Sequence, residues 1–265
     1  MTIDFNAAFG IASNDIVVKP VLKVNASITD FEFLVDDSGS MGSYTNSKQF
    51  SSKVTRKYSV KANAAAIFEA VSEVDTDGVG LWIFSTYVRK IEDATPYKLA
   101  EFFNSSPNGS TNLSGALKKV FAEYLEKRAK KQTKQFTYLV VITDGEPDDE
   151  QSVFDELISF SHKLNCQEEY QIAFFQAGND SGAKLFLNKM GDGLIPVDHP
   201  TADFNQQPKG MFGSIFGNKS NVNTFTPIRS SNGQYSKFDL VTTFDCDKIE
   251  SEANLAQTIA NGAFG

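Results

Sequence analysis

One short stretch constrains the fold more than any other part of the chain. The apolar run Phe31–Val35 passes directly into the polar turn Asp36-Asp37-Ser38-Gly39-Ser40. A short apolar run of this kind predicts a buried strand. A strand that stops at Asp-x-Ser-x-Ser delivers one carboxylate and two hydroxyl groups to its carboxyl end. Ligands of open α/β sheets bind just outside the carboxyl ends of the strands, so the stretch predicts a ligand site at that edge.

Two later stretches are arranged to meet this turn. Gly109-Ser110-Thr111 places a hydroxyl group on a loop, and the apolar run Val140–Ile142 ends at Thr143-Asp144-Gly145. Small hard cations bind carboxylate, hydroxyl and water oxygens, and magnesium usually keeps several of its waters. The predicted metal ligands, some of them acting through water, are Asp36, Ser38, Ser40, Thr111 and Asp144.

The composition of this ligand set indicates which ion it suits and what the ion would do. The set contains no Cys or His, which argues against zinc and favours magnesium, with manganese or calcium as alternatives. Neutral hydroxyl groups compensate little of the charge of the ion. An open coordination position would therefore stay electrophilic and attract an Asp or Glu carboxylate from a partner protein.

The three segments, in this order, resemble the von Willebrand factor A (VWA) domain and its metal-ion-dependent adhesion site. The resemblance covers roughly residues 30–199. The sequences around Asp36 and Asp144 are similar to those of stand-alone intracellular A domains of bacteria and fungi. In such domains a hairpin with a short edge strand is expected. The resemblance implies a doubly wound α/β fold with a mainly parallel central sheet, helices on both faces and one short antiparallel edge strand.

The alternation of apolar patterns along the chain predicts the same architecture. Strands are expected at 79–84, 88–91, 136–143, 171–176 and 194–197, and helices at 55–74, 97–103, 113–131, 151–164 and 183–190. Strands that alternate with helices predict a parallel sheet covered on both faces. The acids of 146–150 are expected either to cap the following helix or to line the rim of the site.

The segments outside this alternation define the remaining organisation. We divide the chain into an N-terminal extension at 1–29, the VWA domain at 30–199, a loop-rich linker at 200–235, and a C-terminal strand and helix at 236–265. The strand pattern at 238–244 is expected to pair with the N-terminal extension.

Charge and cysteine content limit the partners and the compartment. The net charge of −8 argues against nucleic acid, because neutralising phosphates needs clustered Lys and Arg, and against adsorption to anionic lipid. Neither a secretory signal nor a membrane span is expected. Cys166 and Cys246 fit no metal or redox spacing and are expected to be buried or half-buried hydrophobes. The expected location is the cytoplasm, and the oligomeric state stays open.

Three functions are compatible with these patterns. The first is a magnesium-dependent module that binds an acidic partner, and the second is a scaffold subunit in which the metal site is structural. The third, a metal-dependent phosphohydrolase, is disfavoured because Ser38 stands where haloacid-dehalogenase-type enzymes have a second Asp. No P-loop or Gly-x-Ser-x-Gly motif is present, and neither His162 nor His199 lies in a catalytic motif. We therefore expect that the protein is not an enzyme.

Overall fold

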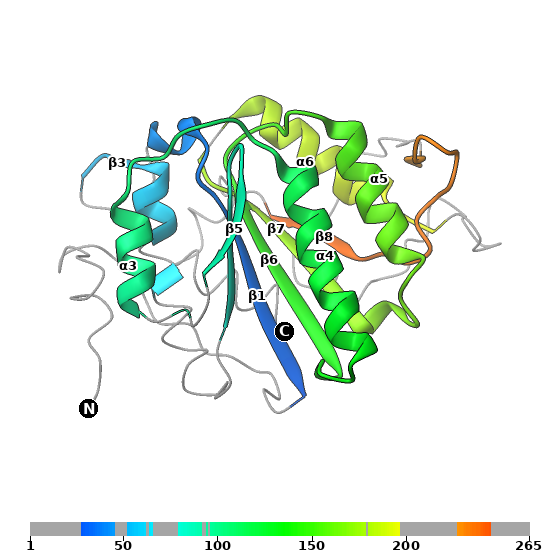
Figure 1. Cartoon of the computed structure of the whole chain (residues 1–265). Coiled ribbons are helices and arrows are strands. Elements are labelled where there is room, and N and C mark those ends of the chain that lie inside the picture. The colour runs from blue at the N-terminus through cyan, green and yellow to red at the C-terminus, as the bar shows by residue number, and fades with distance from the viewer. Residues whose placement is uncertain are drawn as a thin grey trace.

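The protein folds around a central six-stranded sheet in the strand order β5-β4-β1-β6-β7-β8 (Figure 1). The computed structural model describes residues 28–45, 52–61, 64–65, 79–91, 94, 96–178, 180–196 and 227–244. The strands of the central sheet are β1 (Thr29–Asp36), β4 (Gly80–Phe84), β5 (Val88–Ile91), β6 (Phe136–Thr143), β7 (Tyr170–Gln176) and β8 (Val241–Phe244). The helices are α3 (Pro96–Asn104), α4 (Leu113–Ala129), α5 (Glu150–Ser161) and α6 (Ser181–Gly193), with the single turns η1 (Gly39–Gly42) and η2 (Gln167–Glu169).

Five of these six strands run parallel, and only β5 runs antiparallel, at the edge beside β4. The apolar strands β1 and β6 lie at the centre, as expected for strands buried on both faces. A separate pair of two-residue strands, β2 (Tyr44–Thr45) and β3 (Val54–Thr55), forms within the polar segment after β1. The predicted α/β class, the mainly parallel sheet and the antiparallel edge strand are confirmed.

The two faces of the sheet carry separate cores, because successive side chains of a strand point to opposite faces. Phe31, Phe33 and Val35 of β1 pack towards α3 and the helical residues 56–61 and 64–65. Leu34 lies in the other core, with α4, α5 and α6. Figure 1 shows α4 and α5 on one side of the sheet and α3 on the opposite side. The predicted arrangement with helices on both faces is thus observed.

The sixth strand differs from the expectation. The prediction of a strand at 194–197 is wrong for its described part, because residues 194–196 form no strand and Leu194 caps α6 through a backbone bond to Met190. Pro196 lacks an N–H group for a strand ladder. The position is taken by β8, which pairs parallel to β7. There Phe244 stacks on Phe175 with ring centroids 4.4 Å apart.

Several other expectations can be compared with the structure. Cys166 is exposed, so its expected burial is wrong. The N-terminal extension before residue 28, the apolar run 211–216 and the helix predicted at 250–260 lie outside the described residues, as does the pairing expected between the extension and the C-terminal strand. Within the described part of the chain, no helix has both the length and the apolar character needed to cross a membrane.

Candidate metal centre

Asp36, the last residue of β1, is fully buried at the carboxyl edge of the sheet. Its Oδ1 atom accepts a hydrogen bond of 2.7 Å from the backbone N–H of Ser38, and its Oδ2 atom accepts one of 2.7 Å from the Thr143 hydroxyl. The first bond closes the turn after β1, and the second joins that turn to the end of the neighbouring strand β6. The carboxylate is therefore fixed by its own turn and by the adjacent strand.

The two serines of the turn connect Asp36 to Asp144. The Ser38 and Ser40 hydroxyl oxygens lie 3.0 Å apart, and the Ser40 hydroxyl donates a 2.7 Å hydrogen bond to Asp144 Oδ1. Asp144 follows β6 directly and is also fully buried. Four of the five predicted ligands thus form one continuous chain of contacts between two strand ends.

The loop that carries Thr111 is attached to the same edge. Gly109 has a φ of +91°, which favours glycine, and its carbonyl accepts a 3.1 Å bond from the N–H of Gly39. A Cβ atom placed on Gly145 would lie 3.7 Å from Ser40 Oγ and 3.9 Å from Thr111 Oγ1, so both hydroxyl groups face one point. The structure therefore brings Thr111 to the site formed by the other four residues.

The acids after Asp144 were expected either to cap α5 or to line the rim of the site, and the structure shows one acid in each kind of place. Asp149 caps α5, because its side chain accepts a bond from the N–H of Ser152. Asp148 instead accepts a 3.0 Å bond from the N–H of Thr111, and its own N–H donates to the Thr111 carbonyl, also at 3.0 Å. Capping is thus confirmed for one acid, while another holds the Thr111 loop against the site.

The electrostatics of the two buried carboxylates favour a cation. Burial raises the pKa of Asp36 to about 6, against the opposing hydrogen bonds from Ser38 and Thr143. Burial likewise raises the pKa of Asp144 above its ordinary value, against hydrogen bonds from Arg56 and Ser40. The Arg56 guanidinium is the positive charge bonded to this pair of carboxylates, and it contacts Asp144. Two buried carboxylates with one guanidinium, surrounded by hydroxyl oxygens, match the hard oxygen ligands that magnesium and calcium take.

Arg56 is a charged residue of the site that the sequence did not indicate. Its Nη1 atom donates a 2.8 Å hydrogen bond to Asp144 Oδ2, and its backbone N–H donates to the Ser43 carbonyl at 2.8 Å. The side chain packs against Gly178, whose φ is +93° and whose hypothetical Cβ would lie 2.6 Å from Arg56 Nε. No local motif marks Arg56, because the contact joins residues 88 positions apart.

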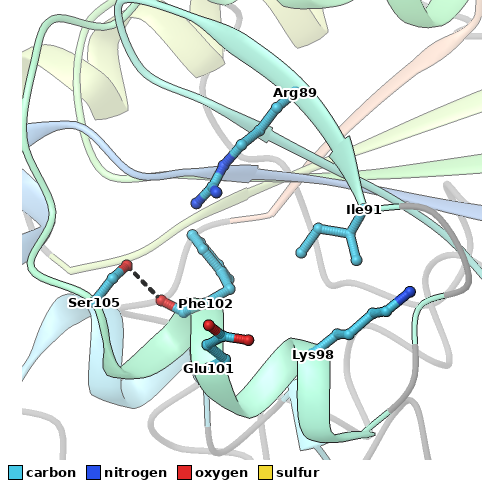
Figure 2. Close-up of a pocket in the computed structure, with 6 residues that line it drawn as sticks. All are labelled: Arg89, Ile91, Lys98, Glu101, Phe102 and Ser105. Carbon is cyan, nitrogen blue, oxygen red and sulfur yellow. Dashed lines mark hydrogen bonds between the residues drawn. The ribbon is translucent and has the colours of Figure 1, made fainter.

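A pocket of about 300 Å³ lies beside the site, between β5 and α3. Figure 2 shows its lining residues, which are Arg89, Ile91, Lys98, Glu101, Phe102 and Ser105. It contains none of the predicted ligands. Lys57 connects the two regions, since its ammonium group lies 2.7 Å from both Asp37 Oδ1 and the Ser105 carbonyl. Burial lowers the pKa of Lys57, and the ion pair with Asp37 opposes that shift.

The fold is that of an α/β domain, and its converging oxygens form a candidate ligand site at the carboxyl edge of the sheet. The chain belongs to the von Willebrand factor type A domain family, whose family model matches residues 30–193. Domains of this family typically bind other proteins, and many hold a divalent metal ion. The predicted family membership is therefore confirmed, whereas an intact metal-ion-dependent adhesion site and an intracellular type stay predictions.

Similar solved structures include three with low sequence identity. Manganese-loaded TRAP protein of Plasmodium vivax is 17% identical with a TM-score of 0.43, and the match covers 62% of this chain and 64% of that one. The SpRpn10 VWA domain is 15% identical with a TM-score of 0.45, covering 61% of this chain and 81% of that one. The type V pili tip protein Mfa5 of Porphyromonas gingivalis is 18% identical with a TM-score of 0.33, covering 45% and 20%. The chain thus spans less than two thirds of TRAP and of the Mfa5 domains, and a search of curated protein sequences gave no match.

Proposed function

We propose that this protein is a divalent-metal-dependent protein-binding module. The ion would be magnesium by preference, with manganese or calcium as alternatives. It would be held by Asp36, Ser38, Ser40, Thr111 and Asp144. The observation that carries the proposal is the chain of contacts at the carboxyl edge of the sheet. It runs from Asp36 to the Ser38 backbone N–H, and from the Ser38 and Ser40 hydroxyls to Asp144. When bound, the ion would supply an electrophilic coordination position that accepts an Asp or Glu carboxylate of a partner protein.

The chain itself prepares this edge for binding. The Ser38 N–H and the Thr143 hydroxyl fix the orientation of the Asp36 carboxylate, and the Ser40 hydroxyl fixes that of Asp144. Asp148 holds the Thr111 loop in place from the other side. Rigid placement of the oxygens lowers the ordering cost of binding, which supports a preformed site.

A binding role without catalysis forms part of the proposal. The groups that contact Asp36 and Asp144 in the described residues are hydroxyls, one backbone N–H and a guanidinium, which orient carboxylates and are poor general bases. His162 caps α5 and contacts the Tyr235 carbonyl at 2.9 Å, which supports a structural role. The net charge of −8 supports an absence of nucleic-acid partners, and we place the protein in the cytoplasm.

Calorimetric titration of the purified chain with magnesium, manganese and calcium chloride tests the metal site. We expect uptake by the wild type and loss of uptake in Asp36→Ala and Ser38→Ala, with a smaller loss in Asp144→Ala if its contact runs through water. Glu126→Ala is the control, because its side chain is 66% exposed on α4. Thermal unfolding of each variant shows whether it folds. A wild type that takes up none of the three ions would refute the proposal.

A second experiment uses the purified chain to capture partner proteins with and without a chelator. It distinguishes a metal-dependent binding module from a scaffold in which the metal is structural. Metal uptake together with chelator-sensitive capture supports the binding module. Metal uptake together with capture that ignores both the chelator and Asp36→Ala would support the scaffold alternative instead.

A further inference from the structure

We infer that Arg56 sets the charge balance of the metal site, opposing entry of the cation and then providing the positive charge that attracts an acidic partner. The inference deepens the proposed function and rests on it. Arg56 would thus raise the metal concentration at which the site fills. It would also make the filled site selective for carboxylates.

The position of Arg56 is built into the fold. Its Nη1 atom lies 2.8 Å from Asp144 Oδ2 and 3.5 Å from the Asp144 carbonyl oxygen. The side chain is only 12% exposed, and its Nε atom is buried without a hydrogen-bond partner among the described residues. A buried N–H group without a partner costs free energy, so hydrogen bonding alone does not explain this placement. Packing on Gly178 and the ion pair with Asp144 hold the guanidinium there.

Counting charges shows why the guanidinium matters. Asp36 and Asp144 bring two negative charges and Arg56 one positive charge, so the empty set carries one net negative charge. A divalent ion changes this to one net positive charge, whereas without Arg56 the filled set would be neutral. A net positive site attracts a carboxylate over distances at which a neutral one does not.

One more carboxylate acts on this balance. Asp180 is close enough to Asp144 to raise its pKa, although burial is the larger cause. The side chain of Asp180 accepts 3.0 Å bonds from the N–H groups of Gly182 and Ala183 at the start of α6. The positive end of that helix compensates much of its charge, so Asp180 changes the balance less than Arg56 does.

The inference predicts that removing the Arg56 guanidinium changes the metal affinity and the carboxylate affinity in opposite directions. Removing the guanidinium should tighten metal binding, because a cation no longer repels the entering ion. It should weaken carboxylate binding to the filled site, because the net positive charge is lost. A residue that merely held Asp144 in place would, on removal, weaken both affinities.

The variants are Arg56→Gln, which removes the charge, and Arg56→Lys, which keeps it. Lys130→Gln is the matched control for the loss of one positive charge, since Lys130 is 58% exposed at the far end of α4. That helix has 17 residues and begins beside Thr111, so its end lies about 25 Å away at 1.5 Å per residue. Thermal unfolding of each variant confirms that it is folded.

Magnesium affinity is measured by calorimetry without any partner. Acetate, the simplest carboxylate, is then titrated into the magnesium-saturated chain and followed by amide chemical shifts. Both titrations are run at pH 8, so that protonation of the carboxylates does not mask the effect. For Arg56→Gln we expect magnesium affinity to rise by roughly tenfold and acetate affinity to fall by roughly threefold or more. Arg56→Lys should stay near the wild type in both, and Lys130→Gln should change neither.

The outcomes separate the two levels of the hypothesis. A wild type that takes up no magnesium overturns the proposed function and this inference together. Normal uptake by the wild type, combined with an unchanged or weaker magnesium affinity in Arg56→Gln, overturns the inference alone. An acetate affinity equal in Arg56→Gln and wild type also overturns it, because the guanidinium then contributes nothing to carboxylate selection.

Discussion

Glu32, the acid near the amino end of β1, leads to a prediction about pH and stability. It is 4% exposed, and burial raises its pKa from 4.5 to about 7. The Lys127 ammonium group on α4, 3.6 Å from Glu32 Oε1, opposes this shift only in part. Asp30 and Glu123 raise the pKa further, and Lys90 lowers it. Glu32 Oε2 is buried without a hydrogen-bond partner among the described residues.

The direction in which stability changes with pH follows from the protons that the folded and the unfolded chain bind. Between pH 4.5 and about 7 the folded chain keeps the proton on Glu32, while the unfolded chain releases it. The contribution of Glu32 to the free energy of unfolding is therefore fully present below pH 4.5, falls as pH rises, and is lost above pH 7. Each pKa unit corresponds to about 1.4 kcal/mol, so the loss across this interval is about 3 kcal/mol.

Glu32→Gln tests this, because the amide has the shape of the acid and does not titrate. We expect urea unfolding at pH 5, 6, 7 and 8 to show a steeper loss of stability in the wild type than in the variant. The difference should grow by about 2.5 kcal/mol between pH 5 and pH 8, because the first part of the loss falls below pH 5. Comparison with the variant is needed because the pKa values of Asp36 and Asp239 are also raised, both to about 6.

Glu126→Gln serves as the control, because it changes an exposed acid on α4, the helix that carries Lys127, and should follow the wild-type profile. Parallel profiles for wild type and Glu32→Gln would contradict the prediction. They would mean that water or a local rearrangement solvates the Glu32 carboxylate at little cost.

Two further predictions concern stability alone. Asp180→Ala removes the N-terminal cap of α6 and should lower the free energy of unfolding by about 1 kcal/mol in urea titration, while Asp180→Asn should keep most of it. Phe244→Ala removes the ring that stacks on Phe175 and should cost about 3 kcal/mol in the same assay. A change below about 0.5 kcal/mol in Phe244→Ala would show that β8 does not unfold with the rest of the sheet.

The parts of the fold that local patterns determine were predictable. The strands β1 and β6 are apolar runs that end abruptly in polar turns, and both the strands and their order along the chain were expected. Because parallel strands end at the same edge of a sheet, the meeting of Asp36 with Asp144 followed from those two patterns. The position of Thr111 followed from the resemblance to the VWA domain, in which the glycine-containing loop before α4 contributes to the site.

A strand was expected at 238–244 and β8 lies within it, but its pairing with β7 depends on contacts that no local pattern records. Both 194–197 (Leu-Ile-Pro-Val) and 241–244 (Val-Thr-Thr-Phe) fall in segments whose patterns predicted a strand, although Pro196 counts against the first. The choice between them depends on which segment reaches β7, and β8 is brought there by a return of the chain. In that return the Ile228 N–H donates to the Gly193 carbonyl at 2.8 Å, and Ser231 bonds to Asp155 on α5. Such long-range closure is not visible as periodicity.

Arg56 and Glu32 escaped prediction for a related reason. The significance of each comes from a partner on a distant element, Asp144 after β6 for the first and Lys127 on α4 for the second. Within its own segment Glu32 is one charged residue inside an apolar strand, and Arg56 is one basic residue at the start of a helix. Only tertiary packing brings charges to them or removes water from them.

The two buried acids of β1 show why the carboxyl end, and not the amino end, is suited to a cation. Glu32 already faces Lys127, and burial shifts its pKa to a value at which it can stay protonated, so the fold compensates its charge internally. At the carboxyl end lie two buried carboxylates, of which Asp144 contacts the Arg56 guanidinium, and both are held by hydrogen bonds that favour the ionised form. One negative charge there is left without an internal counterion. Because uncompensated buried charge is costly, the proposed cation would stabilise this edge of the sheet in a way that the opposite edge does not need.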